Sequence, residues 1–325
     1  MINKTEAQVI SSWKGDISKP LVSVRCLAYN HAGFITDALD GFLNQITSFP
    51  FEIVIHDDAS TDGTPDIIKE YATRFPHIIV PILETENQYS KHDGSVHRII
   101  NPHLKGKYIA LCEGDDYWTD IGKLEKQITY MEKTPHCSMT FHAADFLQGN
   151  VIIGNDRICD FECDMPAERI IEGGGFFCAT ASLCVRTSVF FDFPEFRKMA
   201  NVGDYPLQIL AAISGTVHYY PEIMSVYRYM AQGSWTEKQK SPQRKNEHLL
   251  NEIEWLTELD RYTGQRYHKS VMKRTGDIIR HLYKVGVLDA KTSFNCIFSM
   301  PHCREKYIYI SSLVKNYFAK VIKRN

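Results

Sequence analysis

The sequence has no apolar stretch of about 18 residues or more, the length that a membrane-spanning helix needs. Its first residues are mixed polar and lack the apolar core of a secretory signal peptide. A formal net charge of -2 gives no general attraction to nucleic acid. We therefore expect a cytoplasmic chain without a nucleic-acid partner, either soluble or resting on the inner face of the cytoplasmic membrane.

A disulfide framework is also missing. The nine cysteines are odd in number and scattered, and Cys112 lies inside an apolar run, so we expect reduced thiols that act as small hydrophobes. Cys159 and Cys163 have no second pair at zinc-binding spacing and are interpreted as loop thiols. The run 173–175 is glycine-rich but lacks the Gly-x-Gly-x-x-Gly spacing of a dinucleotide site.

The sequence does contain alternating strand and helix patterns. Apolar runs predict strands over 21–27, 51–55, 77–83 and 107–112, with a further buried strand beginning at Thr180–Ser182. Helical spacing predicts helices over 34–46, after an N-cap at Thr64, and around Leu124–Met131 with Asp120 or Thr119 as cap. This order predicts an α/β fold with a doubly wound, mostly parallel sheet flanked by helices.

The character of the chain changes near residue 239. Residues 1–238 carry the α/β pattern, whereas 239–325 are helical and charged and predict a helical C-terminal extension. Within it, 304–325 has one apolar helical face, with lysine and arginine off that face. Two interpretations stay open: a peripheral helix on an anionic membrane, or a helix packed on its own domain or on a second subunit of a homo-oligomer.

Polar clusters follow three of the predicted strands, over 28–31, 56–63 and 113–118. In parallel sheets ligands bind beyond the carboxyl ends of the strands, so these clusters mark one crevice. A single Asp-Asp pair is more often a turn or a helix cap. Two pairs, 57–58 and 115–116, after strands of one sheet instead favour a divalent cation, Mn²⁺ or Mg²⁺, that bridges to substrate phosphates.

Residues from about 20 to 235 resemble a family 2 glycosyltransferase of GT-A fold. The matching motifs are Val22-Ser23-Val24 through Tyr29-Asn30, Asp57-Asp58-Ala59-Ser60-Thr61-Asp62-Gly63-Thr64, Glu113-Gly114-Asp115-Asp116-Tyr117-Trp118 and Gly203-Asp204-Tyr205-Pro206-Leu207. Each motif is loose by itself, and the four in order over two-thirds of the chain are specific. The resemblance implies that residues 1–238 bind a nucleotide-sugar and carry catalysis.

The resemblance assigns the donor nucleotide to the turn at Ala28, Tyr29 and Asn30. Tyr29 would lie against the nucleobase. Asp58 would accept a hydrogen bond from a base N–H, which favours uracil and hence a UDP-sugar. These roles are implied by the family and not by spacing alone.

The resemblance also assigns the chemistry. Asp115 would face the ribose or the donor, Asp116 would ligate the metal at the diphosphate, and Asp204 matches the general base of the inverting members. A carboxylate can deprotonate the attacking hydroxyl, and a divalent cation can stabilise the leaving diphosphate. One base and one assisted leaving group imply a single displacement with inversion, without a covalent intermediate.

The sequence departs from the family after residue 227. Many members have a histidine two residues after the arginine of this motif, and here Met230 takes its place. Two roles of Arg228 are about equally well supported: a contact to a phosphate group, and a structural ion pair with a nearby carboxylate. Lys91, after the third predicted strand, is a weaker phosphate candidate.

Bacterial relatives make capsule, lipopolysaccharide and other surface glycans, and the resemblance implies a glycan or lipid-linked glycan as acceptor. Two other functions stay open. A nucleotidyltransferase uses a similar carboxylate and metal crevice, although 28–33 is a poor phosphate loop. A catalytically silent sugar- or partner-binding protein would tolerate Met230, whereas intact Asp116 and Asp204 argue against it.

Overall fold

The computed structural model describes residues 2–231, 233–289, 291–293 and 295. The predicted amphipathic helix over 304–325 therefore lies outside the described residues. Among the described residues, no helix combines the length and apolarity needed to cross a bilayer. The chain divides into two compact units, the first comprising 1–165, 176–192 and 210–237 and the second 166–175, 193–209 and 238–325.

The first unit is built on one sheet, in the order β3-β2-β1-β4-β9-β6-β10-β5, with β7 paired to β6 and β8 paired to β10. Its strands are β1 (Val22–Ala28), β2 (Phe51–Asp57), β3 (Ile79–Leu83), β4 (Tyr108–Leu111), β5 (Tyr117–Trp118), β6 (Cys137–Gln148), β7 (Val151–Asn155), β8 (Cys163–Met165), β9 (Cys184–Arg186) and β10 (Thr216–Arg228). Strands β3, β2, β1 and β4 are parallel, as are the long strands β6 and β10. Short antiparallel strands complete the sheet.

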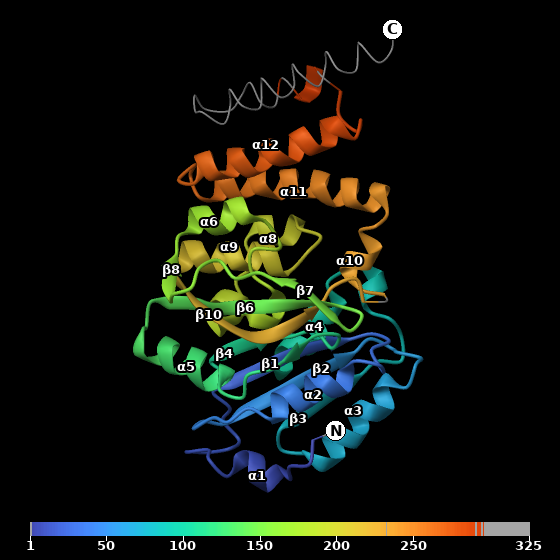
Figure 1. Ribbon diagram of the computed structural model, residues 1–325, viewed down its shortest axis with the longest axis vertical. Helices are drawn as coiled ribbons and strands as arrows, with labels where there is room; N and C mark the ends of the chain where they lie inside the picture. The colour runs from blue at the N-terminus through green and yellow to red at the C-terminus, as the bar shows by residue number, and fades with distance from the viewer. Residues whose placement is uncertain (1, 232, 290, 294, 296–325) are drawn as a thin grey trace. The chain divides into compact units, whose positions relative to one another are not determined.

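Helices connect the parallel strands, which confirms the predicted α/β sheet (Figure 1). The helices that begin in the first unit are α1 (Glu6–Ile10), α2 (Ile35–Leu43), α3 (Thr64–Arg74), α4 (Ser95–Ile100), α5 (Lys123–Lys133), α7 (Thr187–Phe190) and α10 (Trp235–Lys238), with short 3₁₀ turns η1 (Tyr89–Lys91), η2 (Asn101–His103) and η3 (Thr180–Ser182). Burial explains the sequence pattern, because β2 is buried along its whole length and its residues from Ile53 to Ile55 are all apolar.

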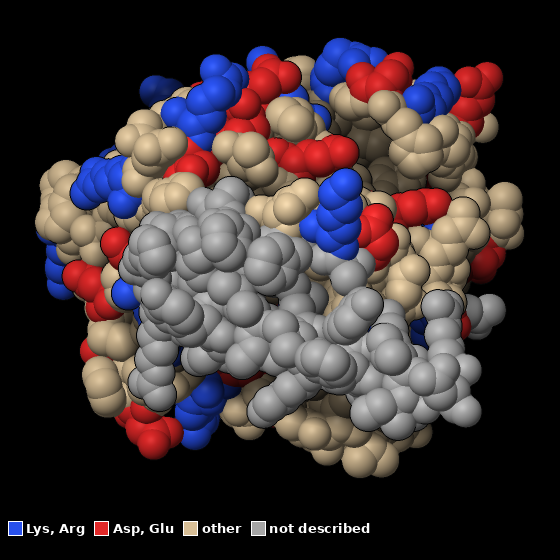
Figure 2. All heavy atoms as spheres, turned by 90° about the horizontal axis from the view of Figure 1, so that it is seen from above, with Lys and Arg blue, Asp and Glu red and all other residues tan. Residues whose placement is uncertain are grey.

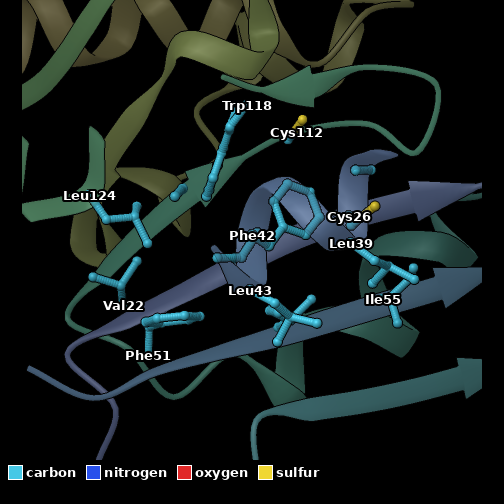
Figure 3. Close-up of a cluster of buried hydrophobic side chains, with 14 of the residues drawn as sticks. Val22, Cys26, Leu39, Phe42, Leu43, Phe51, Ile55, Cys112, Trp118 and Leu124 are labelled. Carbon is cyan, nitrogen blue, oxygen red and sulfur yellow. The ribbon is translucent and has the colours of Figure 1, made fainter. Parts of the chain in front are cut away.

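The core beneath the site lies between β1, β2 and α2 (Figure 3). Phe42 of α2 packs edge-on against Trp118, with ring centroids 4.7 Å apart. The indole Nε1 of Trp118 donates a 2.9 Å hydrogen bond to the carbonyl of Ala181. Because this buried polar atom has a partner, Trp118 holds the turn that follows β4 in one position. Trp118 is thus a core residue.

Three predicted boundaries differ from the structure. Gly63 takes the N-cap of α3 with a φ of 95°, which glycine tolerates, so Thr64 is the first helical residue and not the cap. Helix α5 begins after Gly122, and Asp120 accepts the Gly122 N–H in the preceding turn. Neither Asp120 nor Thr119 is therefore its N-cap. The strand expected from Thr180 begins only at Cys184, because a 3₁₀ turn comes first.

The second unit is helical among its described residues. It contains α6 (Ala167–Gly173), α8 (Glu195–Met199), α11 (Pro242–Tyr262), α12 (His268–Lys284) and the beginning of α9 (Asp204–Ser214). Helices α11 and α12 lie side by side (Figure 1), as the predicted helical C-terminal region requires. On the face seen in Figure 2, basic and acidic side chains are interspersed among the coloured residues, in keeping with the small net charge.

Candidate active site

The site is built where the parallel strands of the first unit end. β1 ends at Ala28, β2 at Asp57 and β4 at Leu111, in neighbouring positions of the sheet. The Asp58 N–H donates to the Ala28 carbonyl at 2.9 Å, so the two chains stay paired just beyond the strands. The three polar clusters predicted from the sequence therefore follow adjacent strands, at the edge where ligands bind in such sheets.

Asn30 joins the loops after β1 and β2. It adopts a left-handed φ of 56°, which asparagine tolerates better than most residues. Its N–H donates to the Ser60 hydroxyl at 2.8 Å, and its side-chain carbonyl accepts the Thr61 N–H at 2.9 Å. Ser60 in turn donates its hydroxyl to Asp57 at 2.5 Å. Asn30 and Asp57 thus shape the site by fixing backbone.

Asp62 and Thr64 make a second link between the same loops. Asp62 accepts the Ala32 N–H at 2.9 Å and the Thr64 hydroxyl at 2.6 Å. The Thr64 oxygen accepts the His31 N–H at 2.9 Å. Asn30, Ser60, Asp62 and Thr64 bind across the two loops, whereas Asp57 holds Ser60 within its own loop. The sequence motif gave no sign of this role, since its spacing is equally typical of a turn.

Tyr29 and Asp58 are the two predicted nucleobase contacts. The Tyr29 side chain is 47 % exposed at the end of β1. Asp58 is buried, and its two oxygens accept the N–H groups of Gln88 at 2.6 Å and Tyr89 at 3.0 Å. A carboxylate has about four acceptor positions, so a base N–H can still be accommodated. Asp58 thus also positions the segment that carries Lys91.

Asp116 is the most buried carboxylate of the predicted donor site. It is 2 % exposed, and its Oδ1 accepts the backbone N–H of Arg228 at 2.8 Å. Burial, helped by the neighbouring charge of Asp115, raises the pKa of Asp116 well above its usual range. The ionised carboxylate is therefore costly here unless a cation compensates it.

Asp115 and Asp116 fit a divalent cation whose coordination is completed by oxygen atoms of the substrate. Among the described residues no three histidine, cysteine, aspartate or glutamate side chains gather as a ready-made metal cage. Mg²⁺ and Mn²⁺ are commonly held by one or two carboxylates together with substrate phosphates. Asp116, with Asp115 beside it in sequence, is the donor set that the structure offers for such an ion.

Arg228 lies at the end of β10 between two aromatic rings. Its guanidinium is 4.5 Å from the Tyr117 ring centroid and 5.0 Å from that of Phe34. Nη1 donates to the Asp115 carbonyl at 2.7 Å, and Nη2 forms an ion pair with Asp37. The structural ion pair considered from the sequence is therefore present, while a phosphate contact stays a prediction. Asp37, on α2, carried no sequence signal.

The Arg228 guanidinium stacks on two aromatic rings and uses both of its terminal nitrogens to bind oxygen atoms. We therefore expect Arg228→Lys to lower the free energy of unfolding by about 1–2 kcal/mol. An ammonium group cannot reach Asp37 and the Asp115 carbonyl in the same planar geometry. Urea unfolding of both proteins measures the change. Arg98→Lys is the matched control, because Arg98 is 62 % exposed and pairs with the exposed Asp93. Equal effects of the two substitutions would show that the stacked site contributes nothing special.

Two further candidates have clear positions. Lys91 is partly exposed, and its ammonium donates to Gln88 at 2.9 Å while lying 3.5 Å from Glu86. Met230 adopts a left-handed φ of 60°, and its N–H donates to the Thr236 hydroxyl at 3.2 Å. The position of the family histidine is thus part of a turn held by its backbone.

His31 was not singled out from the sequence. Burial lowers its pKa, although Asp115 and Asp62 act in the opposite direction, so the ring is neutral at physiological pH. Its Nδ1 is buried without a hydrogen-bond partner, and its ring packs edge-on against Phe34. A lone histidine after a strand gives no signal that could have identified this position.

A shallow hollow of about 320 Å³ lies between α2 and the 117–121 segment. It is lined by Asp37, Asn44, Trp118 and Asp120 among others, and none of the predicted nucleotide or metal residues belongs to its lining. The ends of the parallel strands, and not this hollow, therefore define the candidate site.

Asp204 is the first residue of α9 and belongs to the second unit. Its Oδ1 accepts the N–H of Tyr205 at 2.8 Å. Tyr205 is buried, donates its hydroxyl to the Ile171 carbonyl at 2.6 Å and packs edge-on against Trp255. These contacts fix the start of the helix and hence the half-buried Asp204. Its role as a base stays a prediction.

Solved structures show the kind of fold. The chain is similar in fold to Staphylococcus aureus TarS residues 1–349 in complex with UDP-GlcNAc, with a TM-score of 0.64, 15 % identity, and coverage of 91 % of this chain and 89 % of that one. It is also similar to the Pyrobaculum calidifontis mannosyltransferase PcManGT in complex with GDP-Man and Mn²⁺, with a TM-score of 0.51, 15 % identity, and coverage of 97 % and 94 %. The fold is therefore that of a GT-A glycosyltransferase.

Sequence comparison then gives the family. The family described as "Glycosyl transferase family 2" matches residues 23–187, and the chain belongs to this family. An uncharacterized protein of Mycobacterium tuberculosis is 34 % identical over 265 residues, covering 77 % of this chain and 71 % of that protein. The chain is thus a glycosyltransferase, which leaves the nucleotidyltransferase and the silent binding protein without support.

Two shorter matches carry more informative names. The putative teichuronic acid biosynthesis glycosyltransferase TuaG of Bacillus subtilis is 36 % identical over 125 residues, 38 % of this chain and 46 % of that protein. The Escherichia coli UDP-Glc:alpha-D-GlcNAc-diphosphoundecaprenol beta-1,3-glucosyltransferase WfaP is 36 % identical over 112 residues, 34 % and 41 % of the two chains. Surface-glycan synthesis is thus represented among the relatives.

Proposed function

We propose that this chain is an inverting, metal-dependent glycosyltransferase that moves a sugar from a UDP-sugar to a hydroxyl of a glycan or lipid-linked glycan. It would act in capsule, lipopolysaccharide or other surface-glycan synthesis, in the cytoplasm or at the inner face of the cytoplasmic membrane. The observation that carries the proposal is the buried Asp116 carboxylate, held by the Arg228 N–H beyond the parallel strands.

The donor nucleotide is proposed to bind at Ala28, Tyr29 and Asn30. The exposed Tyr29 ring offers a flat apolar surface for a base, and Asp58 supplies a buried acceptor for a base N–H. The loop links through Asn30 keep this surface preformed, which reduces the entropy lost on binding. Uracil is favoured because WfaP is named for UDP-Glc and TarS is bound to UDP-GlcNAc.

Asp116, with Asp115, is proposed to hold Mn²⁺ or Mg²⁺ at the diphosphate. When bound, the cation acts as a Lewis acid that stabilises charge on the leaving diphosphate. Arg228 and Lys91 are the chain's own cationic candidates on the phosphate side. Both already have acceptors in the chain: Arg228 is largely buried, whereas the Lys91 side chain is 42 % exposed.

Asp204 is proposed to accept the proton of the attacking hydroxyl as that oxygen bonds to the anomeric carbon and the diphosphate departs. Its position at the start of α9 is rigid, because Tyr205 is anchored on both its ring and its hydroxyl. A single displacement inverts the anomeric carbon and needs no enzyme nucleophile. The acceptor supplies the only attacking oxygen.

Thermal unfolding with UDP, GDP, CDP and dTDP, each with and without Mn²⁺, tests the donor site. A ligand that binds only the folded state raises the melting temperature by mass action. We expect a Mn²⁺-dependent rise with UDP in the wild type, and its loss in Asp116→Asn. Asp160→Asn is the control, because the Asp160 side chain is 92 % exposed and follows β7, which is not one of the strands that end at the candidate site.

The outcomes separate the parts of the proposal. A rise with GDP instead of UDP would overturn the uracil assignment and keep the metal site. A rise that survives Asp116→Asn would overturn the metal ligand. No rise with any nucleotide would overturn the donor site as a whole.

A further inference from the structure

Two cysteine thiols lie in contact outside the candidate site. The Sγ atoms of Cys159, in the segment between β7 and β8, and of Cys163, the first residue of β8, are 3.6 Å apart, and both residues are partly exposed. The other cysteines that the structure describes are buried: Cys26, Cys112, Cys137, Cys178 and Cys184. The Cys159 and Cys163 pair therefore differs from them in access to solvent.

The segment carrying this pair is tethered at its start. The Asp156 carboxylate accepts the N–H of Ala144 at 2.6 Å and that of Ala179 at 3.3 Å. The Arg157 guanidinium donates to the Pro221 carbonyl at 3.1 Å. The approach to Cys159 is thus fixed against the sheet and does not hang free in solvent.

One buried tyrosine anchors both cysteines. The Tyr219 hydroxyl accepts the N–H of Ile158 at 3.0 Å and lies 3.4 Å from the Cys159 carbonyl. The backbone of Tyr219 pairs with Cys163 in the antiparallel ladder between β10 and β8. Since the same residue positions both ends of the loop, the sulfur atoms stay adjacent.

We propose that Cys159 and Cys163 form a redox-responsive pair that interconverts between dithiol and disulfide by exchange with a small-molecule or protein disulfide. A disulfide has an S–S distance of about 2.05 Å, so the sulfurs must approach by only about 1.5 Å. The short loop between them makes ring closure an intramolecular step with a high effective concentration.

The exchange balances in two steps. The thiolate of one cysteine attacks a sulfur of the oxidant RSSR, forms a mixed disulfide and releases RS⁻, which takes up the proton that the cysteine lost. The second cysteine thiolate then attacks the protein sulfur of that mixed disulfide and releases the second RSH. Overall the pair gives two electrons and two protons to RSSR and yields two RSH.

The charges near the pair guide the choice of oxidant. Asp160, Glu162 and Asp164 lie beside the cysteines in sequence and pair with Arg157, Lys126 and His218, so charges of both signs are close to the pair. The uncharged reagent 2-hydroxyethyl disulfide is therefore suitable, because its access does not depend on these charges. Cys296 and Cys303 lie outside the described residues and are replaced by serine in the full-length test protein.

The folded Cys296→Ser, Cys303→Ser protein is equilibrated with 2-hydroxyethyl disulfide, alkylated and measured by intact mass and peptide mapping. We expect the loss of two alkylatable thiols and of two hydrogen atoms, confined to the peptide with Cys159 and Cys163 and reversed by dithiothreitol. Adding Cys163→Ser should leave one stable mixed disulfide on Cys159, because no second thiol can resolve it.

Separate mixed disulfides on both cysteines, or no reaction at either while the buried cysteines stay unreacted, would overturn the proposal. Alkylation of the buried cysteines reports unfolding and is checked in the same map. If they react, the oxidation is repeated at a lower temperature until they do not, so that a folded chain is always the one tested. The readout does not involve sugar transfer and is therefore independent of the proposed function.

Discussion

Replacing Asp204 with asparagine is expected to lower kcat by about 10²- to 10⁴-fold while donor binding is unchanged. Asparagine keeps an oxygen for the Tyr205 N–H, so the start of α9 should persist, but it cannot accept a proton at neutral pH. Release of nucleoside diphosphate from the donor, with a lipid-linked glycan as acceptor, measures the rate. Thermal unfolding with UDP and Mn²⁺ measures binding.

Asp116→Asn gives the contrasting pattern, because it should remove both the rate and the Mn²⁺-dependent rise in melting temperature. Asp160→Asn should change neither. If Asp204→Asn lost the nucleotide-dependent rise as well, Asp204 would belong to donor binding. If it kept the full rate, another group would be the base.

The second large effect concerns Lys123 and pH. This residue is fully buried, its ammonium donates to Gln127 at 2.8 Å, and it lies 4.1 Å from the Trp118 ring centroid. Burial lowers its pKa from 10.5 to about 8, against the opposing influence of Cys184 and Cys112. Its charged form is therefore less favourable in the folded chain than in the unfolded chain.

The sign of the pH dependence follows from proton binding. Between pH 8 and 10.5 the unfolded chain holds more protons at Lys123 than the folded chain, so stability rises with pH across this window. The lowered pKa corresponds to about 3 kcal/mol, present as a cost below pH 8 and absent above pH 10.5. Lys123→Met removes this contribution, because methionine does not titrate.

We therefore expect the unfolding free energy of the wild type to rise by up to about 3 kcal/mol relative to Lys123→Met between pH 7.5 and 10.5. Urea unfolding at several pH values measures this difference, and titrations shared by both proteins cancel. Lys133→Met, at an exposed position of the same helix, should run parallel to the wild type. Parallel curves for Lys123→Met would mean that the buried amine titrates normally.

The sequence was sufficient to predict the parallel strands β1 to β4. Strands β1 and β2 are buried along nearly their whole length, so apolar residues predominate in them and predict the strands, although Ser23, Arg25 and Glu52 are buried there as well. The first residues of the helices were harder to predict. The N-cap residues Gly63 and Gly122 have no side chain that could form a capping hydrogen bond, so the usual capping signal is absent from the sequence.

The candidate site shows the same division. The place of Asp116 beyond a strand could be predicted because its motif follows an apolar run, whereas the contacts of Asp37 and His31 form only on folding. Lys123 looked like an ordinary charged helix residue, and its burial against Trp118 depends on packing from a distant part of the chain. Local patterns report strand ends well and tertiary neighbours poorly.

The hydrogen bond from the Arg228 main chain to Asp116 has a consequence for engineering. Any amino acid except proline supplies the same N–H, so a mutant library at position 228 can vary size and charge while the carboxylate keeps its main-chain donor. Arg228→Pro is therefore the one substitution at this position that removes the main-chain donor of Asp116, whereas the other substitutions report on the guanidinium contacts alone.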